Sequence, residues 1–314
     1  MNKVIAKYLL LAVILFSVMF LEETKAALKK DSIDEYVAYV MPYFKNKCEK
    51  LHLAYSYDAK KWIALNDNQP VFDAGVRLRD PFVNRVNGKF HLVHTKAWNN
   101  PTIYHWESSD LMNWEGGPIE VVDSLKLRAW APEFIYCEEE KMFYVHWSSL
   151  HEGHNAIHYT KTKDWKNISP EKSKVYYDLG IHDIDLTIIN AKGQYYAFHK
   201  PGATKDKMGN RMYVSPTLDP EKDNFGFGKF DSGKVVFNNQ TQPTEGPQVI
   251  KVLREEKWYV YCDPFKSSLE AWETTNFIDF KKIDVVTPKD SKHCSIIPVT
   301  KKELKKLLKK YKKK

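Results

Sequence analysis

The sequence has few of the residues that build thiolate or nucleophile sites, with only four cysteines in 314 residues. It contains no Cys-x-x-Cys pair, so a zinc site held by paired thiolates is not expected. It contains no Gly-x-Ser-x-Gly, which excludes the usual nucleophile turn of α/β-hydrolases. The segment 151–154, His-Glu-Gly-His, has a histidine spacing of three where the zinc proteases have four. The segment 226–228, Gly-Phe-Gly, lacks the third glycine and the strand–helix context of a dinucleotide site.

Long apolar runs are also scarce, and the longest lies near the N-terminus. Lys3 and Lys7 precede an apolar run from Tyr8 to Leu21, and Thr24-Lys25-Ala26 then offers small residues for cleavage. This order is typical of a signal peptide, so residues 1–26 are predicted to be removed and the protein to be exported to the periplasm or outside the cell. Fourteen residues are few for a membrane helix, so no permanent membrane span is expected after cleavage.

The excess of positive charge is confined to the end of the chain. The net charge is +8, but residues 301–314 hold nine lysines and one glutamate, and the body between residues 27 and 300 is close to neutral. Nucleic-acid binding by the body is therefore not expected. The Lys-rich tail is interpreted as a solvated helix end or a disordered segment, with weak attachment to an anionic surface as the alternative.

An aromatic, strand-like segment recurs five times along the chain. The recurrences are 52 to 63 residues apart, and each is followed by turn residues. A period of about 50 residues with several short strands indicates a β-propeller, whereas an open β-sandwich would require the spacing to be accidental. The segments begin at residues 35, 89, 142, 194 and 257.

The repeats predict an all-β, five-bladed β-propeller in one domain, residues 27–300, followed by the Lys-rich tail, residues 301–314. The first aromatic segment precedes any inner strand, so its inner strand must come from the C-terminal end, at 293–299. Pairing of the N- and C-terminal strands would close the ring and remove free sheet edges. The inner strands are expected to begin near Asp80, Glu133, Asp185, Glu245 and His293 and to face one central funnel.

Three carboxylates stand at the heads of these inner strands: Asp80, Asp185 and Glu245. Carboxylates that converge on one point are the machinery of glycoside hydrolysis. Inversion needs one carboxylate to activate water and one carboxylic acid to protonate the leaving oxygen. A third carboxylate beside the acid helps it keep its proton.

The chain resembles glycoside hydrolase family 43 over about residues 35–299. The motifs that carry the resemblance are Arg79-Asp80-Pro81-Phe82, Trp130-Ala131-Pro132-Glu133, Ile184-Asp185, Glu245-Gly246-Pro247 and Lys292-His293. The resemblance implies that Asp80 is the general base, Glu245 the general acid and Asp185 the residue that tunes the pKa of the acid and orients it. It also implies that Trp130 stacks on a sugar, with packing between blades as the alternative. His293 is implied to approach one Ca2+ ion through water, although no cofactor is expected to be required.

The segment 51–58, with Trp62, is similar to bacterial members described as arabinosidases. The expected function is therefore an exported, exo-acting, inverting α-L-arabinofuranosidase on plant oligosaccharides or polysaccharides. A β-xylosidase or a galactan-directed enzyme with the same fold is the alternative within the family. A carbohydrate-binding propeller without activity is the alternative from another class, although it would not need three convergent acids.

Three details of the sequence leave questions for the structure. Cys294 stands where many relatives have glycine. Asp183 lies two residues before Asp185, so strand alternation would point both side chains to one face. The cysteines Cys48, Cys137, Cys262 and Cys294 allow three disulfide pairings, with Cys262 near Cys294, but buried free thiols are equally compatible with the sequence.

Overall fold

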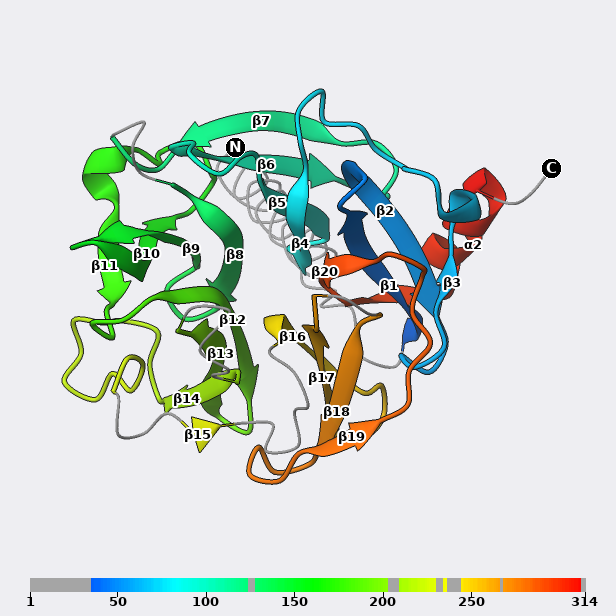
Figure 1. The fold of residues 1–314 in the computed structure, drawn as a ribbon. Helices are drawn as coiled ribbons and strands as arrows, with labels where there is room; N and C mark the ends of the chain where they lie inside the picture. The colour runs from blue at the N-terminus through cyan, green and yellow to red at the C-terminus, as the bar shows by residue number, and fades with distance from the viewer. Residues whose placement is uncertain are drawn as a thin grey trace, which may run out of the picture. The chain divides into compact units, whose positions relative to one another are not determined.

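Five separate β-sheets form a ring in the computed structural model, which describes residues 35–123, 128–202, 209–229, 234–235, 244–265 and 268–311 (Figure 1). Each sheet is one antiparallel blade. The prediction of a five-bladed β-propeller is confirmed, and the open sandwich is excluded.

The blades follow one another along the chain. The first blade contains β1 (Tyr36–Lys45), β2 (Cys48–Ser56), β3 (Ile63–Ala64), β20 (Lys292–Cys294) and β21 (Ile297–Thr300). The second contains β4 (Arg79–Val86), β5 (Lys89–Thr95), β6 (Thr102–Ser108) and β7 (Glu115–Glu120). The third contains β8 (Trp130–Cys137), β9 (Met142–His151), β10 (His154–Thr162) and β11 (Lys174–Tyr177). The fourth contains β12 (Asp183–Ala191), β13 (Gln194–Pro201), β14 (Arg211–Ser215) and β15 (Lys234–Val235). The fifth contains β16 (Glu245–Lys251), β17 (Trp258–Asp263), β18 (Glu270–Thr274) and β19 (Lys281–Ile283).

The ring closes in the first blade, where strands from both ends of the chain pair. β1 pairs with β21 between Tyr36 and Thr300 and with β20 between Tyr43 and Cys294. The predicted closure is therefore confirmed. The single strand expected at 293–299 is instead two short strands, and between them the Ser295 N–H donates to the carbonyl of Pro42 at 3.1 Å.

The innermost strands β4, β8, β12 and β16 share a bulge near their first residue. At the bulge, each of these strands has one residue more than the neighbouring strand. In β4, for example, Arg79 and Phe82 are three positions apart, whereas their partners Thr95 and Val93 are two positions apart. In each of these strands, the residue that follows the first paired residue of the bulge has a positive φ, and His293 of β20 has one too. These five residues are Asp80, Ala131, Asp185, Gly246 and His293, with φ from 26° to 58°. A bulge redirects a side chain and is common beside functional sites.

Aromatic side chains fill the interfaces between blades. Trp62, between β2 and β3 of the first blade, donates its indole N–H to the hydroxyl of Tyr261 in the fifth blade at 3.0 Å. Trp165, between β10 and β11 of the third blade, packs on Phe134 of the same blade and on His105 of the second blade. Trp62 and Trp165 therefore pack between neighbouring blades.

The Lys-rich segment forms helix α2 (Lys301–Tyr311), which packs beside the first blade (Figure 1). Thr300 and Glu303 form a reciprocal capping box, because Glu303 Oε2 accepts from the Thr300 N–H at 2.8 Å and Thr300 Oγ1 accepts from the Glu303 N–H at 3.3 Å. The guanidinium of Arg85 in β4 binds both carboxylate oxygens of Glu303. Leu304 and Leu307 are buried in the core, while the lysines face solvent. The segment is thus solvated on one face only.

Truncation of Leu307 to alanine is expected to destabilise the propeller by about 2–5 kcal/mol, because a fully buried side chain is lost and a cavity remains. Urea unfolding of Leu307→Ala beside Lys306→Ala measures this effect. Lys306 is an exposed neighbour on the same helix, and its change should lie within about 0.5 kcal/mol of wild type. Equal stability of the two variants would show that α2 adds nothing to the core.

All four cysteines lie within the described residues and are free thiols. Cys137, Cys262 and Cys294 are buried. The cysteines are therefore free thiols, and none of the possible disulfide pairings is formed. Within the described parts of the chain, no helix has the length and apolarity needed to cross a membrane. Residues 1–26 lie outside the described residues, so the signal peptide stays a prediction.

Candidate functional site

The bulged heads of the inner strands meet at one pocket of about 540 Å³, a volume that includes its open mouth. Four of its lining residues are first residues of the bulges: Arg79, Trp130, Ile184 and Glu245. Three more are the residues with positive φ: Asp80, Asp185 and His293. The structure therefore brings all five residues predicted for the site into a single pocket.

The three carboxylates do not occupy equivalent positions in the repeat. Asp80 and Asp185 both stand at the bulge residue, whereas Glu245 stands one residue earlier and Gly246 takes the bulge position. A Cβ atom added to Gly246 would lie 3.0 Å from the ring of His293. Gly246 therefore supplies both the left-handed backbone conformation and the space that His293 occupies.

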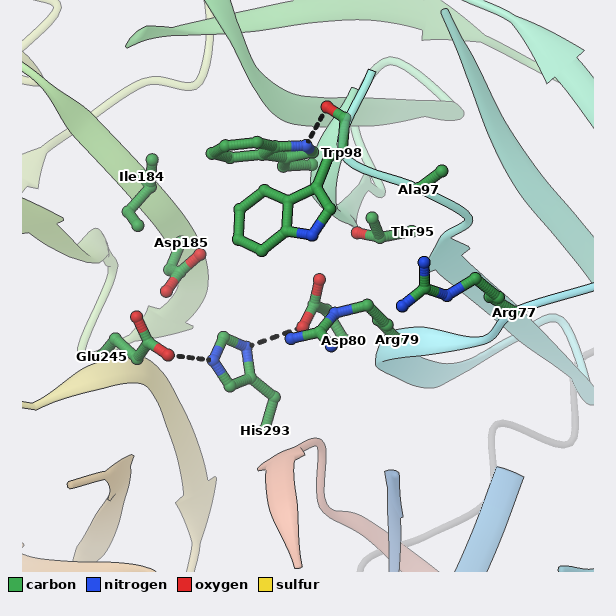
Figure 2. A pocket seen from close by; sticks show the side chains of 11 residues that line it. Arg77, Arg79, Asp80, Thr95, Ala97, Trp98, Ile184, Asp185, Glu245 and His293 are labelled. Carbon is green, nitrogen blue, oxygen red and sulfur yellow. Dashed lines mark hydrogen bonds and ion pairs between the residues drawn. The ribbon is translucent and has the colours of Figure 1, made fainter. Parts of the chain in front are cut away.

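His293 connects two of the carboxylates across the floor of the pocket (Figure 2). Its Nδ1 lies 3.2 Å from Asp80 Oδ1, and its Nε2 lies 3.1 Å from Glu245 Oε1. The side chains of all three are largely buried, between 13% and 21% exposed. Asp80 and Glu245 therefore face each other across one imidazole ring.

Asp185 is the most deeply buried of the three acids, at 6% exposure. Its Oδ2 accepts from the Gly246 N–H at 3.0 Å, and its own N–H donates to Ser148 Oγ at 3.3 Å. Burial raises the pKa of Asp185 to about 7; positively charged His293 opposes this shift, while Glu245 and Asp80 add to it. The cluster therefore holds a proton near neutral pH, and this proton is shared among interacting groups.

His293 provides the positive charge at the centre of the cluster. Burial alone would lower the pKa of His293, but Asp80, Glu245 and Asp185 together raise it well above its ordinary value. The ring is thus an imidazolium at neutral pH, and it makes a hydrogen bond to Glu245 through Nε2 and an ion pair with Asp80 through Nδ1. It fixes the positions of two carboxylates that would otherwise repel each other.

The raised pKa of Asp185 predicts that folding stability falls as pH rises. The folded state binds this proton more tightly than the unfolded state, so the stabilisation is present below pH 4 and is lost between about pH 4 and 7. Asp185→Asn removes this titration. Its stability relative to wild type is expected to increase by a few kcal/mol between pH 4 and pH 8. Thermal unfolding at several pH values measures this, and parallel curves for the two proteins would contradict it.

The walls of the pocket include residues that the sequence did not single out. Trp98 packs edge-on against Trp130, whose indole N–H donates to the Trp98 carbonyl at 2.8 Å. Trp98 is 61% exposed, and it follows β5 in a connection without any periodic pattern. Its one sequence signal is an aromatic residue beside the turn residues Asn99-Asn100-Pro101.

Two arginines form the wall of the pocket nearest to Asp80. Arg79 Nη1 lies 2.9 Å from Glu49 Oε1, and Arg77 binds both oxygens of the same carboxylate. The Arg79 guanidinium also stands over the ring of Phe44, 4.7 Å from its centre. One carboxylate thus fixes two guanidinium groups beside the pocket.

The expectation that Asp183 and Asp185 point to one face is wrong. The bulge between Ile184 and Thr187 breaks the alternation of β12. Asp183 is fully buried inside the fourth blade and binds His199 Nδ1 at 2.8 Å, whereas Asp185 lines the pocket. Only Asp185 can therefore contact a ligand.

Glu133 lies below the pocket in a smaller inner space of about 270 Å³, which Asp185, Gln248 and His293 also line. The amide of Gln248 donates to one oxygen of Glu133, and the other oxygen is buried without a hydrogen-bond partner among the described residues. Burial raises the pKa of Glu133 well above its usual value. These oxygens fit a hard cation such as Ca2+. Both ring nitrogens of His293 contact carboxylates, so neither is free to bind an ion directly.

The arrangement suits an acid–base displacement on a small polar ligand. Asp80 and Glu245 approach the ring of His293 from its two sides, and retaining glycosidases need their carboxylates only about 5–5.5 Å apart. An imidazole ring separates this pair, with contacts of 3.2 Å to Asp80 and 3.1 Å to Glu245, which is in keeping with the wider gap of about 6.5–9.5 Å that admits a water molecule.

The chain matches a family model described as "Probable glycosyl hydrolase domain", of the family 43-related type, over residues 34–305. Among solved structures, the endo-arabinase from Bacteroides thetaiotaomicron VPI-5482 is similar at a TM-score of 0.54 and 14% identity, covering 72% of this chain and 95% of that one. A candidate exo-β-1,3-galactanase from Bifidobacterium bifidum s17 has a TM-score of 0.51 and 10% identity, covering 67% and 72%. At such identities these structures show the fold alone.

A comparison with curated proteins gave no match. The family model, by contrast, spans nearly all of the described propeller, and the fold agrees with it. The chain therefore belongs to glycoside hydrolase family 43, whose members hydrolyse O-glycosidic bonds with inversion.

Proposed function

We propose that the protein is an exo-acting α-L-arabinofuranosidase, with Asp80 as general base, Glu245 as general acid and Asp185 as the residue that tunes and orients the acid. The observation that carries the role assignment is the placement of Asp80 and Glu245 on opposite sides of His293, with Asp185 beside Glu245. An inverting hydrolase needs this arrangement of two separated carboxylates.

In the proposed reaction, a sugar sits above His293 with its anomeric carbon between the two carboxylates. Asp80 accepts a proton from a water molecule as that water attacks the anomeric carbon. Glu245 donates a proton to the glycosidic oxygen as the bond to the leaving group breaks. Asp185, with a carboxylate oxygen within 4.8 Å of one of Glu245, orients the acid and tunes its pKa. The imidazolium of His293 holds both carboxylates in place while the charge moves.

The lining of the pocket supports the binding of a sugar. Trp98 and Trp130 form one wall and Arg77 and Arg79 another. Aromatic faces commonly stack on sugar rings because both present apolar surfaces, so we assign Trp98 and Trp130 to substrate binding.

The choice of arabinose rests on the resemblance of residues 51–58 to arabinosidases. The similar solved structures include an endo-arabinase and a candidate galactanase, so galactosides belong in the test. A panel of p-nitrophenyl α-L-arabinofuranoside, β-D-xyloside and β-D-galactoside measures the preference. We expect kcat/KM to be highest for the arabinofuranoside. A higher kcat/KM for the xyloside or the galactoside would show that the enzyme prefers that sugar to arabinose. The proposed roles of the three acids would not change.

A cofactor is not needed for these steps. If Ca2+ binds below the pocket, the oxygens of Glu133, Gln248 and Asp185 would hold it with water molecules, and His293 would approach it through water. The ion would supply positive charge beneath the cluster.

We further propose that the enzyme is exported and acts on plant oligosaccharides or polysaccharides. The support is the sequence of Lys3, Lys7 and the apolar run from Tyr8 to Leu21. Mass spectrometry of the protein secreted by its host should show an N-terminus at Ala27, and an uncleaved N-terminus would contradict the export proposal.

A further inference from the structure

Two histidines and a glutamate gather in the second blade, away from the pocket. His91 of β5 and Glu107 of β6 are directly opposite each other, and His105 lies on the same strand as Glu107. His91 Nδ1 is 3.0 Å from His105 Nε2 and 3.9 Å from Glu107 Oε1. One ligand atom of each residue lies within 4.8 Å of the other two. The three side chains therefore present two nitrogens and one oxygen to a common point.

We propose that His91, His105 and Glu107 form a binding site for a first-row divalent cation, with Zn2+ as the best fit. Two imidazoles and one carboxylate are an established ligand set for zinc that leaves a fourth position open. No thiolate takes part in the set, so a site that favours Cu(I) or an iron–sulfur cluster is not expected.

The surroundings of the three residues favour metal binding. His91 and His105 are 5% and 8% exposed. Burial lowers the pKa of His91 to about 4 and of His105 to about 3, so both rings are neutral at pH 7 and need not lose a proton to bind.

The site has support on one side and access on the other. Trp165 of the third blade stacks on His105 with ring centres 3.8 Å apart and holds the ring in place. Lys89 binds Glu107 Oε2 at 2.6 Å, which leaves Oε1 directed to His91. His105 and Glu107 also line an open groove, which gives a path for the ion and room for a water ligand.

The proposed site is separate from the catalytic pocket and does not rest on the proposed function. Lys89 pairs with Val86 at the far end of β4, whereas Arg79 and Asp80 stand at the first end of the same strand. A metal here would join β5 and β6 on the face of the blade that packs against Trp165. Its expected effect is on stability, because an ion that binds only the folded state stabilises it.

Titration of the chelator-treated, full-length protein with CoCl2 tests the proposal directly. We expect one Co2+ per chain, a visible absorption band of the intensity typical of tetrahedral Co2+, and displacement of that band by Zn2+. Saturating Zn2+ should raise the Tm by about 3 °C or more. A wild-type protein that binds neither ion with an affinity on the order of micromolar overturns the proposal.

Two variants and two controls locate the ion. Glu107→Gln should weaken binding by about tenfold or more, and His105→Phe, which keeps a ring on Trp165, should abolish it. Glu115→Gln removes the charge of an exposed glutamate opposite Glu107 on β7, and it should bind as wild type does. Glu245→Gln should also bind as wild type. Loss of the Co2+ band in Glu245→Gln with retention in Glu107→Gln would place the ion in the catalytic pocket and overturn the proposal. Glycosidase turnover should be unchanged in Glu107→Gln.

Discussion

Glu245→Gln is expected to lower kcat on arabino-oligosaccharides by about 10²–10⁴-fold, because the amide cannot protonate the leaving oxygen. The loss should shrink when the leaving group is a weak base. The 2,4-dinitrophenolate released from a 2,4-dinitrophenyl glycoside leaves with little help from an acid. The variant should therefore cleave this glycoside far better than the oligosaccharide. Kinetics on both substrates measure the difference.

The exposed Glu120 on β7 offers a matched control for the same chemical change. Glu120→Gln should retain wild-type rates, and thermal unfolding should show that both variants fold. An equal loss on the dinitrophenyl glycoside and on the oligosaccharide would mean that Glu245 does not act as the acid.

Asp80→Asn is expected to lower kcat by a comparable factor of about 10²–10⁴, but for every leaving group alike. The base acts on the attacking water, so easier departure of the aglycone cannot compensate for its loss. In the variant, His293 also loses one of its two carboxylate partners. The measurement is kcat for a series of aryl glycosides of differing leaving-group basicity.

Asp290→Asn changes an exposed aspartate and serves as the control for Asp80→Asn. The two catalytic variants should thus respond differently to the leaving group: activity recovers in Glu245→Gln with a better leaving group, and it does not recover in Asp80→Asn. If Asp80→Asn recovers on the dinitrophenyl glycoside and Glu245→Gln does not, the roles of the two residues are reversed.

The ring and its closure could be predicted from the sequence because they depend on periodic features. The aromatic segments at 89, 142, 194 and 257 became β5, β9, β13 and β17, and the fifth inner strand came from the C-terminal end as expected. Periodicity reports which residues face a core, and a propeller repeats that pattern in every blade. Asp80, Asp185 and Glu245 could be placed near one funnel for the same reason.

The bulges could not be predicted, because they break the alternation on which a strand prediction rests. Their residues with positive φ include Asp80, Ala131, Asp185 and His293, and only Gly246 carries the usual sequence signal for this conformation. Non-glycine residues rarely adopt it, so tertiary packing must impose it here. This is why Asp183 was expected beside Asp185, and why Glu245 proved to stand one residue before the position that Asp80 and Asp185 share.

The residues of the pocket walls could not be predicted from the sequence for a different reason. Trp98 belongs to a connection between β5 and β6, and Arg77 precedes the first residue of β4. Connections follow no hydrophobic period, so their contribution to a pocket depends on how the ring places them. Glu49, which fixes Arg77 and Arg79, comes from β2 in the first blade.

The stereochemistry of the first product tests the central claim most directly. Proton NMR during hydrolysis of p-nitrophenyl α-L-arabinofuranoside, or of the preferred glycoside from the panel, resolves the two anomers before they interconvert. A pocket in which Asp80 and Glu245 stand on opposite sides of His293 predicts that the anomer of inverted configuration forms first. Initial formation of the retained anomer would contradict the account, because it requires a carboxylate close enough to attack the sugar itself.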